Sequence, residues 1–195
     1  MTRRSLAPVE CHLVGVEHEV LELARRQHGV IGYAQLLAAG LSADAIRNRA
    51  ARGWLRRRHR GVYLVGPVEP PLARAMAATL ACGDGALLSH APAAVLWGLR
   101  PPPAGEMHVT VVGRNVKGPP GVTVHRIRRL HPADATRHRG IPTTSPARTL
   151  LDLATTAQHR ELERATDEAH IHHHVTDDSR KEHSAVTRRT EVPRH

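Results

Sequence analysis

The chain has 195 residues, which is enough for one domain and a smaller one, or for two small domains. Its formal net charge of +10 favours a polyanionic partner, and an aromatic content of only 2% excludes nucleic-acid binders that stack bases on several aromatic side chains. Two cysteines without paired spacing exclude a disulfide framework, and neither a signal peptide nor a membrane-spanning apolar window is recognised, so we expect a cytoplasmic protein.

The first part of the chain, after an N-terminal arm at residues 1–16, has the pattern of a winged helix-turn-helix. Apolar periodicity and glycine stops predict three short helices, over residues 17–29, 33–39 and 43–52. Ser42 offers its hydroxyl as the N-cap of the third helix, and Asp44 lies in its first turn. A strand, a turn at residues 60–61 and a returning strand predict a hairpin. Three helices followed by a hairpin define a winged helix at residues 17–66.

The third helix and the hairpin together carry a dense cluster of arginine. No acidic residue occurs between Asp44 and Glu69. A cluster of one charge sign repels itself, so it indicates a partner that neutralises it, and phosphate is the obvious one. The candidate DNA-binding residues are Arg47, Asn48, Arg49, Arg52, Arg56, Arg57, Arg58 and Arg60.

These candidates divide into a reading helix and an anchoring hairpin. Arg47, Asn48 and Arg52 lie on the outer side of the predicted helix, and their side chains can bond guanine and adenine edges in a major groove. The hairpin arginines at residues 56–60 would contact phosphate and set affinity. The alternative is a winged helix that serves as a protein-interaction module.

A proline-marked linker after Gly66 leads to residues 67–169, which we expect to form a small α+β domain. Strands are predicted at 107–112 and 122–127, and helices at residues 72–83, 91–99, 146–154 and 158–169. Ser145 caps the third of these helices, whose expected inner stripe is Ala147, Leu150, Leu151 and Ala154. Residues 170–195 have almost no apolar content and are predicted to be a disordered basic, His-rich tail.

Three groups of residues suggest catalysis or metal binding, and none is convincing. Ser89 and His90, with Asp84 nearby, lack the nucleophile elbow of a hydrolase, and neighbouring residues do not readily form a nucleophile–base pair. We expect them to form a buried polar cap before the next helix. Four acids alternate with arginine on the last helix, as on a solvated face, at Glu161, Glu163, Asp167 and Glu168. The tail histidines offer only adventitious metal affinity, at His170, His172, His173 and His174.

Arg148 and Asp152 stand four residues apart on one predicted helix. We expect a simple intrahelical ion pair worth a few tenths of a kcal/mol, although the two residues could instead touch a partner protein. With no catalytic constellation in the chain, we predict a non-enzyme that uses no metal, no cofactor and no small-molecule substrate.

The sequence resembles AbiEi-type antitoxins of type IV toxin-antitoxin systems. Three motifs carry the resemblance in the expected order: the winged-helix run through residues 28–66, L-L-S-H-A-P-A-A-V-L-W-G-L at residues 87–99, and T-S-P-A-R-T-L-L-D-L-A at residues 144–154. Longer relatives carry a further domain similar to very-short-patch-repair endonucleases, which is not recognised here. The pattern departs from the family at His170, which suggests a truncation or a frameshift.

The resemblance implies a transcriptional regulator that represses its own operon by binding double-stranded operator DNA. It also implies a functional link to a nucleotidyltransferase-like toxin, which need not involve direct binding. One alternative is the truncated remnant of a nuclease-type effector that binds DNA without catalysis. Another is a nucleoid binder without sequence preference, whose affinity would depend steeply on salt.

Overall fold

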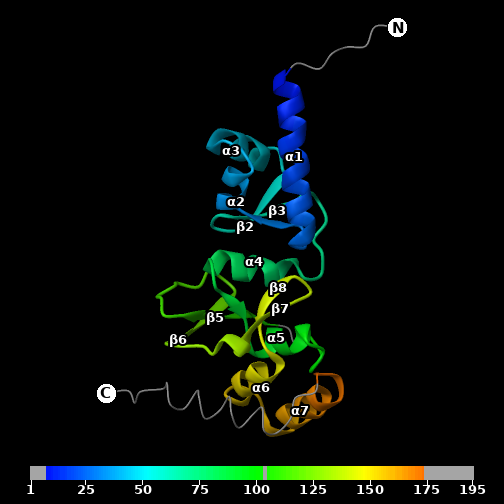
Figure 1. Ribbon diagram of the computed structural model, residues 1–195, viewed down its shortest axis with the longest axis vertical. Coiled ribbons are helices and arrows are strands. Elements are labelled where there is room, and N and C mark those ends of the chain that lie inside the picture. The colour runs from blue at the N-terminus through cyan, green and yellow to red at the C-terminus, as the bar shows by residue number, and fades with distance from the viewer. Residues whose placement is uncertain (1–7, 103–104, 174–195) are drawn as a thin grey trace. The chain divides into compact units, whose positions relative to one another are not determined.

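The structure is a computed structural model that describes residues 8–102 and 105–173 (Figure 1). The chain divides into two compact units, Met1–Ala81 and Cys82–His195, and each is treated by itself. Both units mix helices with strands, which confirms the predicted α+β class. No helix in the described ranges is long and apolar enough to cross a membrane.

The first unit is a winged helix followed by one further helix. Its elements are α1 (Pro8–Arg26), β1 (Val30–Gly32), α2 (Tyr33–Ala38), α3 (Ala43–Ala51), β2 (Leu55–His59), β3 (Val62–Val65) and α4 (Ala73–Cys82). Strands β1 and β2 both pair antiparallel with the central β3. The three helices and the hairpin are therefore as predicted. The sequence did not indicate β1, and α1 starts at Pro8, inside the segment expected to be an arm.

Helix α3 is held at its start by a cap and along one side by an apolar core. The Ser42 hydroxyl accepts a hydrogen bond of 3.2 Å from the backbone N–H of Ala45, as the N-cap prediction requires. Ile46 is 1% exposed and packs in the core cluster that contains Leu36 and Leu55. The buried side of α3 is thereby fixed, and its opposite side faces away from the core.

The β2–β3 hairpin contains an irregularity at its arginine-rich end. Arg57 pairs with Tyr63 while His59 pairs with Val62, so Arg58 is the extra residue of a β-bulge. Gly61 closes the turn with φ of +73°, a left-handed conformation that glycine adopts without a steric penalty. A bulge strengthens the local twist of a strand and redirects its side chains.

The segment expected to be a linker is bound to the first unit. The Arg56 guanidinium donates to the carbonyl oxygens of Gly66, at 3.0 Å, and Pro67, at 2.6 Å. Arg58 forms an ion pair with Glu69 from the same segment. These contacts hold the start of the segment to the first unit, which extends to Ala81, beyond the boundary after Gly66 that composition suggests.

The second unit contains a mixed five-stranded sheet and three helices. Its elements are β4 (Leu87–Leu88), α5 (His90–Leu96), β5 (Met107–Val112), β6 (Val122–Ile127), a 3-10 turn (Pro132–Asp134), β7 (Ala135–His138), β8 (Ile141–Thr144), α6 (Pro146–Ala154) and α7 (His159–His173). The strand order is β6-β5-β4-β8-β7. The predicted strands β5 and β6 do pair, and they run parallel. Strand β7 was not predicted.

Helices α5, α6 and α7 share an alanine- and leucine-rich cluster. On α6 the Ser145 hydroxyl accepts a hydrogen bond of 3.2 Å from the N–H of Arg148, so the predicted cap is confirmed. The inner stripe is partly wrong, because Leu153 is fully buried while Ala154 is exposed. Helix α7 continues to His173, so the first residues of the predicted tail are helical, and the rest of that tail lies outside the described residues.

Removing the buried side chain of Ile46 should destabilise the first unit. We expect Ile46→Ala to lower its free energy of unfolding by about 2–5 kcal/mol, because the substitution leaves a cavity in a packed core. The matched Leu37→Ala, at a side chain 44% exposed, should change it by less than about 0.5 kcal/mol. Urea unfolding followed by Trp54 fluorescence in a Trp97→Phe background reports on this unit alone. Equal effects of the two substitutions would contradict the assigned core.

Candidate nucleic-acid interface

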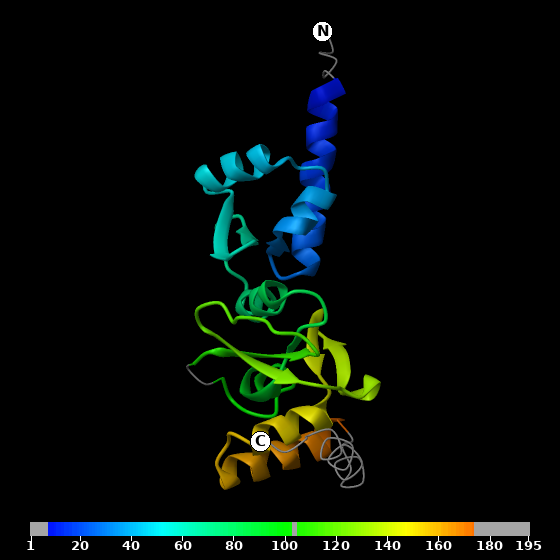
Figure 2. The ribbon, with the colours of Figure 1, turned by 90° about the vertical axis from the view of Figure 1, so that its left-hand side faces the viewer.

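Helix α3 contacts strand β2, so the helix and the hairpin are neighbours in the winged helix (Figure 2). Asn48 and Arg52 are exposed on α3, and Arg57 and Arg60 are exposed on β2 and at the hairpin turn. The arrangement brings an amide and three guanidinium groups to adjacent elements. Amide and guanidinium groups are the ones that bond base edges and phosphate.

Arg49 lies on α3 but is engaged within the unit. Its guanidinium donates to a Glu17 carboxylate oxygen at 2.8 Å and lies 5.8 Å from the ring centroid of Trp54. Its side chain is only 19% exposed. These contacts join α1, α3 and the start of the hairpin, so they favour a structural role for a residue that was predicted to contact DNA.

The remaining candidates differ in how far their charge is already compensated. Arg47 pairs with Asp44 three residues earlier on α3, and both side chains are largely exposed. Arg58 pairs with Glu69, and Arg56 is bound to two carbonyl oxygens. An exposed pair such as that of Arg47 is weak and can exchange its carboxylate for a phosphate. The guanidinium of Arg56 is less available, because it would have to give up two backbone contacts.

His59, in the middle of the basic run, adds no charge at neutral pH. Burial lowers the pKa of His59 below its ordinary value of 6.5, and the neighbouring Arg58 charge lowers it further. The positive charge of the hairpin therefore comes from its arginines alone.

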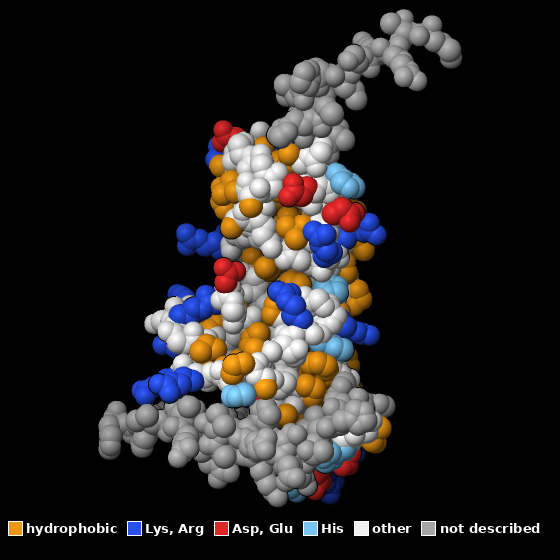
Figure 3. Space-filling view, in the orientation of Figure 1, with side chains coloured by type: hydrophobic (Ala, Val, Ile, Leu, Met, Phe, Trp, Pro, Cys, Tyr) orange, Lys and Arg blue, Asp and Glu red, His pale blue; other side chains and the backbone are white. Residues whose placement is uncertain are grey.

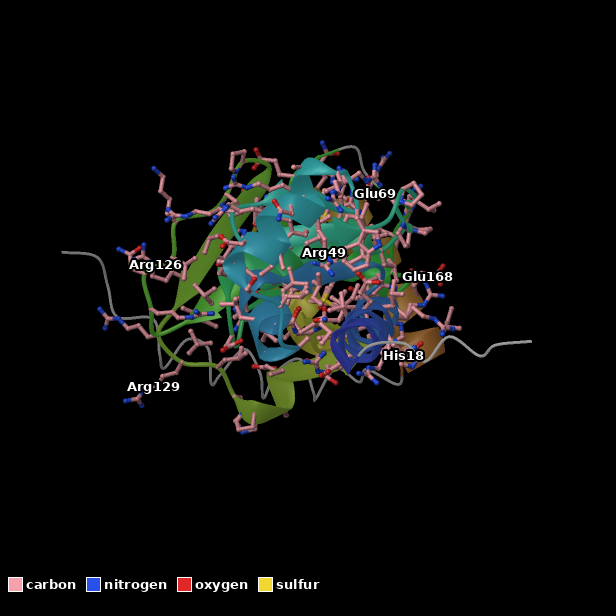
Figure 4. The ribbon with its side chains drawn as sticks, turned by 90° about the horizontal axis from the view of Figure 1, so that it is seen from above. His18, Arg49, Glu69, Arg126, Arg129 and Glu168 are labelled. Atoms are coloured by element: carbon pink, nitrogen blue, oxygen red, sulfur yellow. The ribbon has the colours of Figure 1, made fainter. Side chains whose placement is uncertain are left out.

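The second unit carries a separate basic surface that sequence reasoning missed. A depression beside the ends of β5 and β6 is lined by Gly113, Arg114, Asn115, Arg126, Ile127 and Arg128. Arg126 and Arg129 point outward (Figure 4), and Lys and Arg side chains project from both units on the face drawn in Figure 3. The run R-I-R-R at residues 126–129 has no acidic neighbour, and that signal could have revealed the surface.

Ser89 and His90 interact although they are adjacent in sequence. The Ser89 hydroxyl oxygen lies 3.0 Å from Nδ1 of His90, and both residues are buried. Their predicted burial is confirmed, but His90 is already the first residue of α5, and the Ser89 side chain makes no capping hydrogen bond to that helix. Nδ1 of His90 is thus engaged by the hydroxyl of the preceding residue, and both side chains are buried in the core of the second unit.

The acidic residues of α7 are spread along a helix whose other side is buried through Ala165 and Ala169. Glu161 pairs with Arg100, and Glu163 pairs with His159 on the same helix. Asp167 is exposed. Carboxylates that are spread along a helix differ from the clustered oxygen donors of a magnesium site.

Arg148 and Asp152 form the predicted ion pair, but it is buried. The Asp152 Oδ1 accepts a hydrogen bond of 2.8 Å from Nε of Arg148, and Nη2 of Arg148 lies 2.8 Å from the same oxygen. The two side chains are only 10% and 4% exposed. The expectation of a weak surface pair is therefore wrong. Breaking a buried pair costs far more than breaking an exposed one, because it leaves a charge without compensation. Burial also removes the pair from the surface that a partner protein could touch.

Comparison with models of protein families finds one match in each unit. A model described as "Transcriptional regulator, AbiEi antitoxin" matches residues 18–66, and one described as "AbiEi antitoxin C-terminal domain" matches residues 84–191. The chain belongs to the AbiEi antitoxin family. The first match spans the winged helix. The second covers the five-stranded unit and extends past His170, the residue at which the sequence predicted a departure from the family pattern.

Two further comparisons add little. A crystal structure of the Rv2827c protein from Mycobacterium tuberculosis aligns at 19% identity over 92% of this chain and 83% of that chain, with a TM-score of 0.46. That degree of likeness supports no conclusion about function. A search of curated proteins found no match. The AbiEi family descriptions alone place the chain among antitoxins that act as transcriptional regulators, a role with DNA and a toxin as partners.

The buried Asp152 should make the stability of the second unit depend on pH. Burial raises the pKa of Asp152 from 3.8 to about 6, against the opposing effect of the Arg148 charge. The folded chain therefore binds more protons than the unfolded chain between these values. The resulting stabilisation is complete below about pH 4 and is lost as pH rises through about 6.

We expect the wild type to lose on the order of 2–3 kcal/mol of unfolding free energy from pH 4 to pH 7 through deprotonation of Asp152. Asp152→Asn should not show this loss, because asparagine does not titrate. Urea unfolding followed by Trp97 fluorescence in a Trp54→Phe background measures this difference. The control Asp167→Asn, at an exposed position on α7, should show a much smaller pH-dependent difference from the wild type. A difference for Asp152→Asn that is constant over this pH range would contradict the assigned burial effect.

Proposed function

We propose that this AbiEi antitoxin binds operator DNA through its winged helix and represses its own operon. The observation that carries the proposal is the exposed polar side of α3, with Asn48 and Arg52, beside the exposed Arg57 and Arg60 of the hairpin. In winged helices of this topology a helix of this kind enters the major groove, while the hairpin contacts the backbone. A regulator of this kind acts in the cytoplasm, where the DNA is.

The contacts narrow the set of eight DNA-binding candidates. Asn48 and Arg52 read bases, with Arg47 next to them on the helix and able to leave Asp44. Arg57 and Arg60 bind phosphate, and Arg58 assists from the bulge. Arg49 and Arg56 hold the unit together, because both guanidinium groups are engaged by groups of the protein itself.

The role as an antitoxin extends to a toxin partner, for which we propose a nucleotidyltransferase-like protein, on the strength of the sequence resemblance. Co-expression with such a protein from the neighbouring gene tests this directly. Restored growth supports the link. Unchanged toxicity, with the chain folded and expressed, would count against it and leave the DNA-binding proposal intact.

The operator proposal predicts a mobility shift of the DNA upstream of the chain's own gene, with strong preference over random DNA. Arg52→Ala should lower that preference by roughly tenfold or more, since a good bidentate base contact discriminates by about 1–3 kcal/mol. Asn48→Ala should act in the same direction.

The matched control is Arg25→Ala, which removes an exposed arginine of α1 that is paired with Glu22. It should leave both affinity and preference unchanged. By contrast, Arg49→Ala should lower the unfolding temperature, because it removes the contacts with Glu17 and Trp54. No shift of the upstream DNA by the wild-type chain at low salt would overturn the proposal.

Loss of the hairpin arginines should instead weaken binding equally on all sequences. Arg57→Ala combined with Arg60→Ala should reduce the slope of log affinity against log salt by about 2, because each phosphate contact contributes about 0.9. Fluorescence anisotropy over a salt series gives the slope for operator and random duplexes. A slope that matches that of the Arg25→Ala control would show that the hairpin does not touch phosphate.

A further inference from the structure

Three histidines from separate elements of the second unit meet at one point. They are His90 at the start of α5, His108 in β5 and His125 in β6. One ring nitrogen from each lies within 4.8 Å of the other two. His108 Nδ1 is 2.9 Å from His125 Nε2, and the His90 ring stacks on the His125 ring at 3.6 Å between centroids.

The parallel pairing of β5 and β6 brings His108 and His125 together. Thr110 is the register partner of His125, and His108 stands two residues before Thr110 on β5. Because side chains alternate along a strand, His108, Thr110 and His125 lie on one face of the sheet. The N–H of Ser89 donates to the carbonyl of His108 at 2.9 Å, which holds the adjoining His90 against that face.

His90 is held in place from its own backbone as well. Its φ is +54°, in the left-handed region that residues other than glycine seldom adopt. Backbone strain of this kind persists where the surroundings impose it, and it clusters at functional sites. The Ser89 hydroxyl engages Nδ1, so Nε2 is the nitrogen left for a ligand. A hydrogen bond to one ring nitrogen orients the other, as in metal-binding histidines.

The surroundings of the cluster suit a cation. The Oγ1 of Thr110, fully buried on the same face, has no hydrogen-bond partner among the described residues. The nearby Arg148 charge is compensated by Asp152. Burial lowers the pKa of all three histidines, that of His90 to about 3, so the imidazoles are neutral at pH 7, which is the form that binds metal.

We propose that His90, His108 and His125 form a binding site for a divalent transition metal of the zinc class. Zinc–imidazole bonds of about 2.0–2.1 Å place tetrahedral ligand atoms about 3.3 Å apart. This value lies between the 2.9 Å of the His108–His125 pair and the 4.8 Å within which all three nitrogens fall. Three nitrogen ligands leave a fourth position for water or an anion. The site lies within the second unit and is independent of the DNA-binding proposal.

The alternative is a cluster of stacked rings that only fills space in the core. The two hypotheses predict different numbers of metal ions bound per chain: one for a metal site and none for a space-filling cluster. The experiment uses the full chain without an affinity tag, in a background where His170, His172, His173 and His174 are each replaced by Gln. This background removes the adventitious metal affinity predicted for these four histidines.

We expect this background chain to retain one Zn²⁺ per chain after dialysis, and to give the visible absorption of tetrahedral Co²⁺ when cobalt is added. His108→Gln and His125→Gln should each weaken Zn²⁺ binding at least tenfold, since loss of even an outer-shell partner costs about 10–100-fold. Zn²⁺ should also raise the unfolding temperature of the background chain. The matched His18→Gln, at an exposed position on α1, should change none of these quantities.

Absence of bound Zn²⁺ in the background chain would overturn the proposal. So would an affinity that neither His108→Gln nor His125→Gln changes. If His125→Gln does not fold, the half-buried His108→Gln decides the outcome, with circular dichroism as the check that it is folded.

Discussion

The burial of Ile46 is the constraint on which the DNA-binding surface depends. Its side chain packs with Leu36 and Leu55, so one side of α3 is fixed against the core of the winged helix. The same core cluster includes residues of α3 and β2, two elements that contact each other, so the hairpin lies beside the helix. Asn48 and Arg52 are exposed because they lie on the side of α3 that this packing leaves free. An apolar contact therefore determines which polar groups can reach DNA.

The arginine cluster combines two tasks that sequence alone cannot separate. Arg49 and Arg56 satisfy groups of the protein, a carboxylate and two carbonyls, and so stabilise the frame that presents the others. Arg52, Arg57 and Arg60 project to solvent. The second unit shows the same division between structural and exposed arginines, since Arg148 is engaged in a buried pair while Arg126 and Arg129 point outward (Figure 4). The net charge therefore overstates the number of guanidinium groups that are available to bind a polyanion.

Local signals predicted most of the fold, and long-range pairings explain what they missed. The Ser42 and Ser145 caps follow from short-range hydrogen bonding, and both are found. Strand β1 is only three residues long and exists because β3 pairs with it, so no local pattern marks it. The eight candidate residues were chosen by type and spacing, and neither criterion reveals that Arg49 pairs with Glu17 and Arg58 with Glu69. The His108–His125 contact likewise arises only from the parallel register.

The most direct measurement of how α3 meets DNA is dimethyl sulfate footprinting of the chain on its own upstream region. Guanine N7 lies in the major groove, where an entering helix shields it from methylation. We expect protection of a few discrete guanines within the bound site, and its loss with Arg52→Ala while Arg25→Ala leaves it unchanged. A bound complex in which no guanine N7 is protected would show that α3 does not enter the major groove.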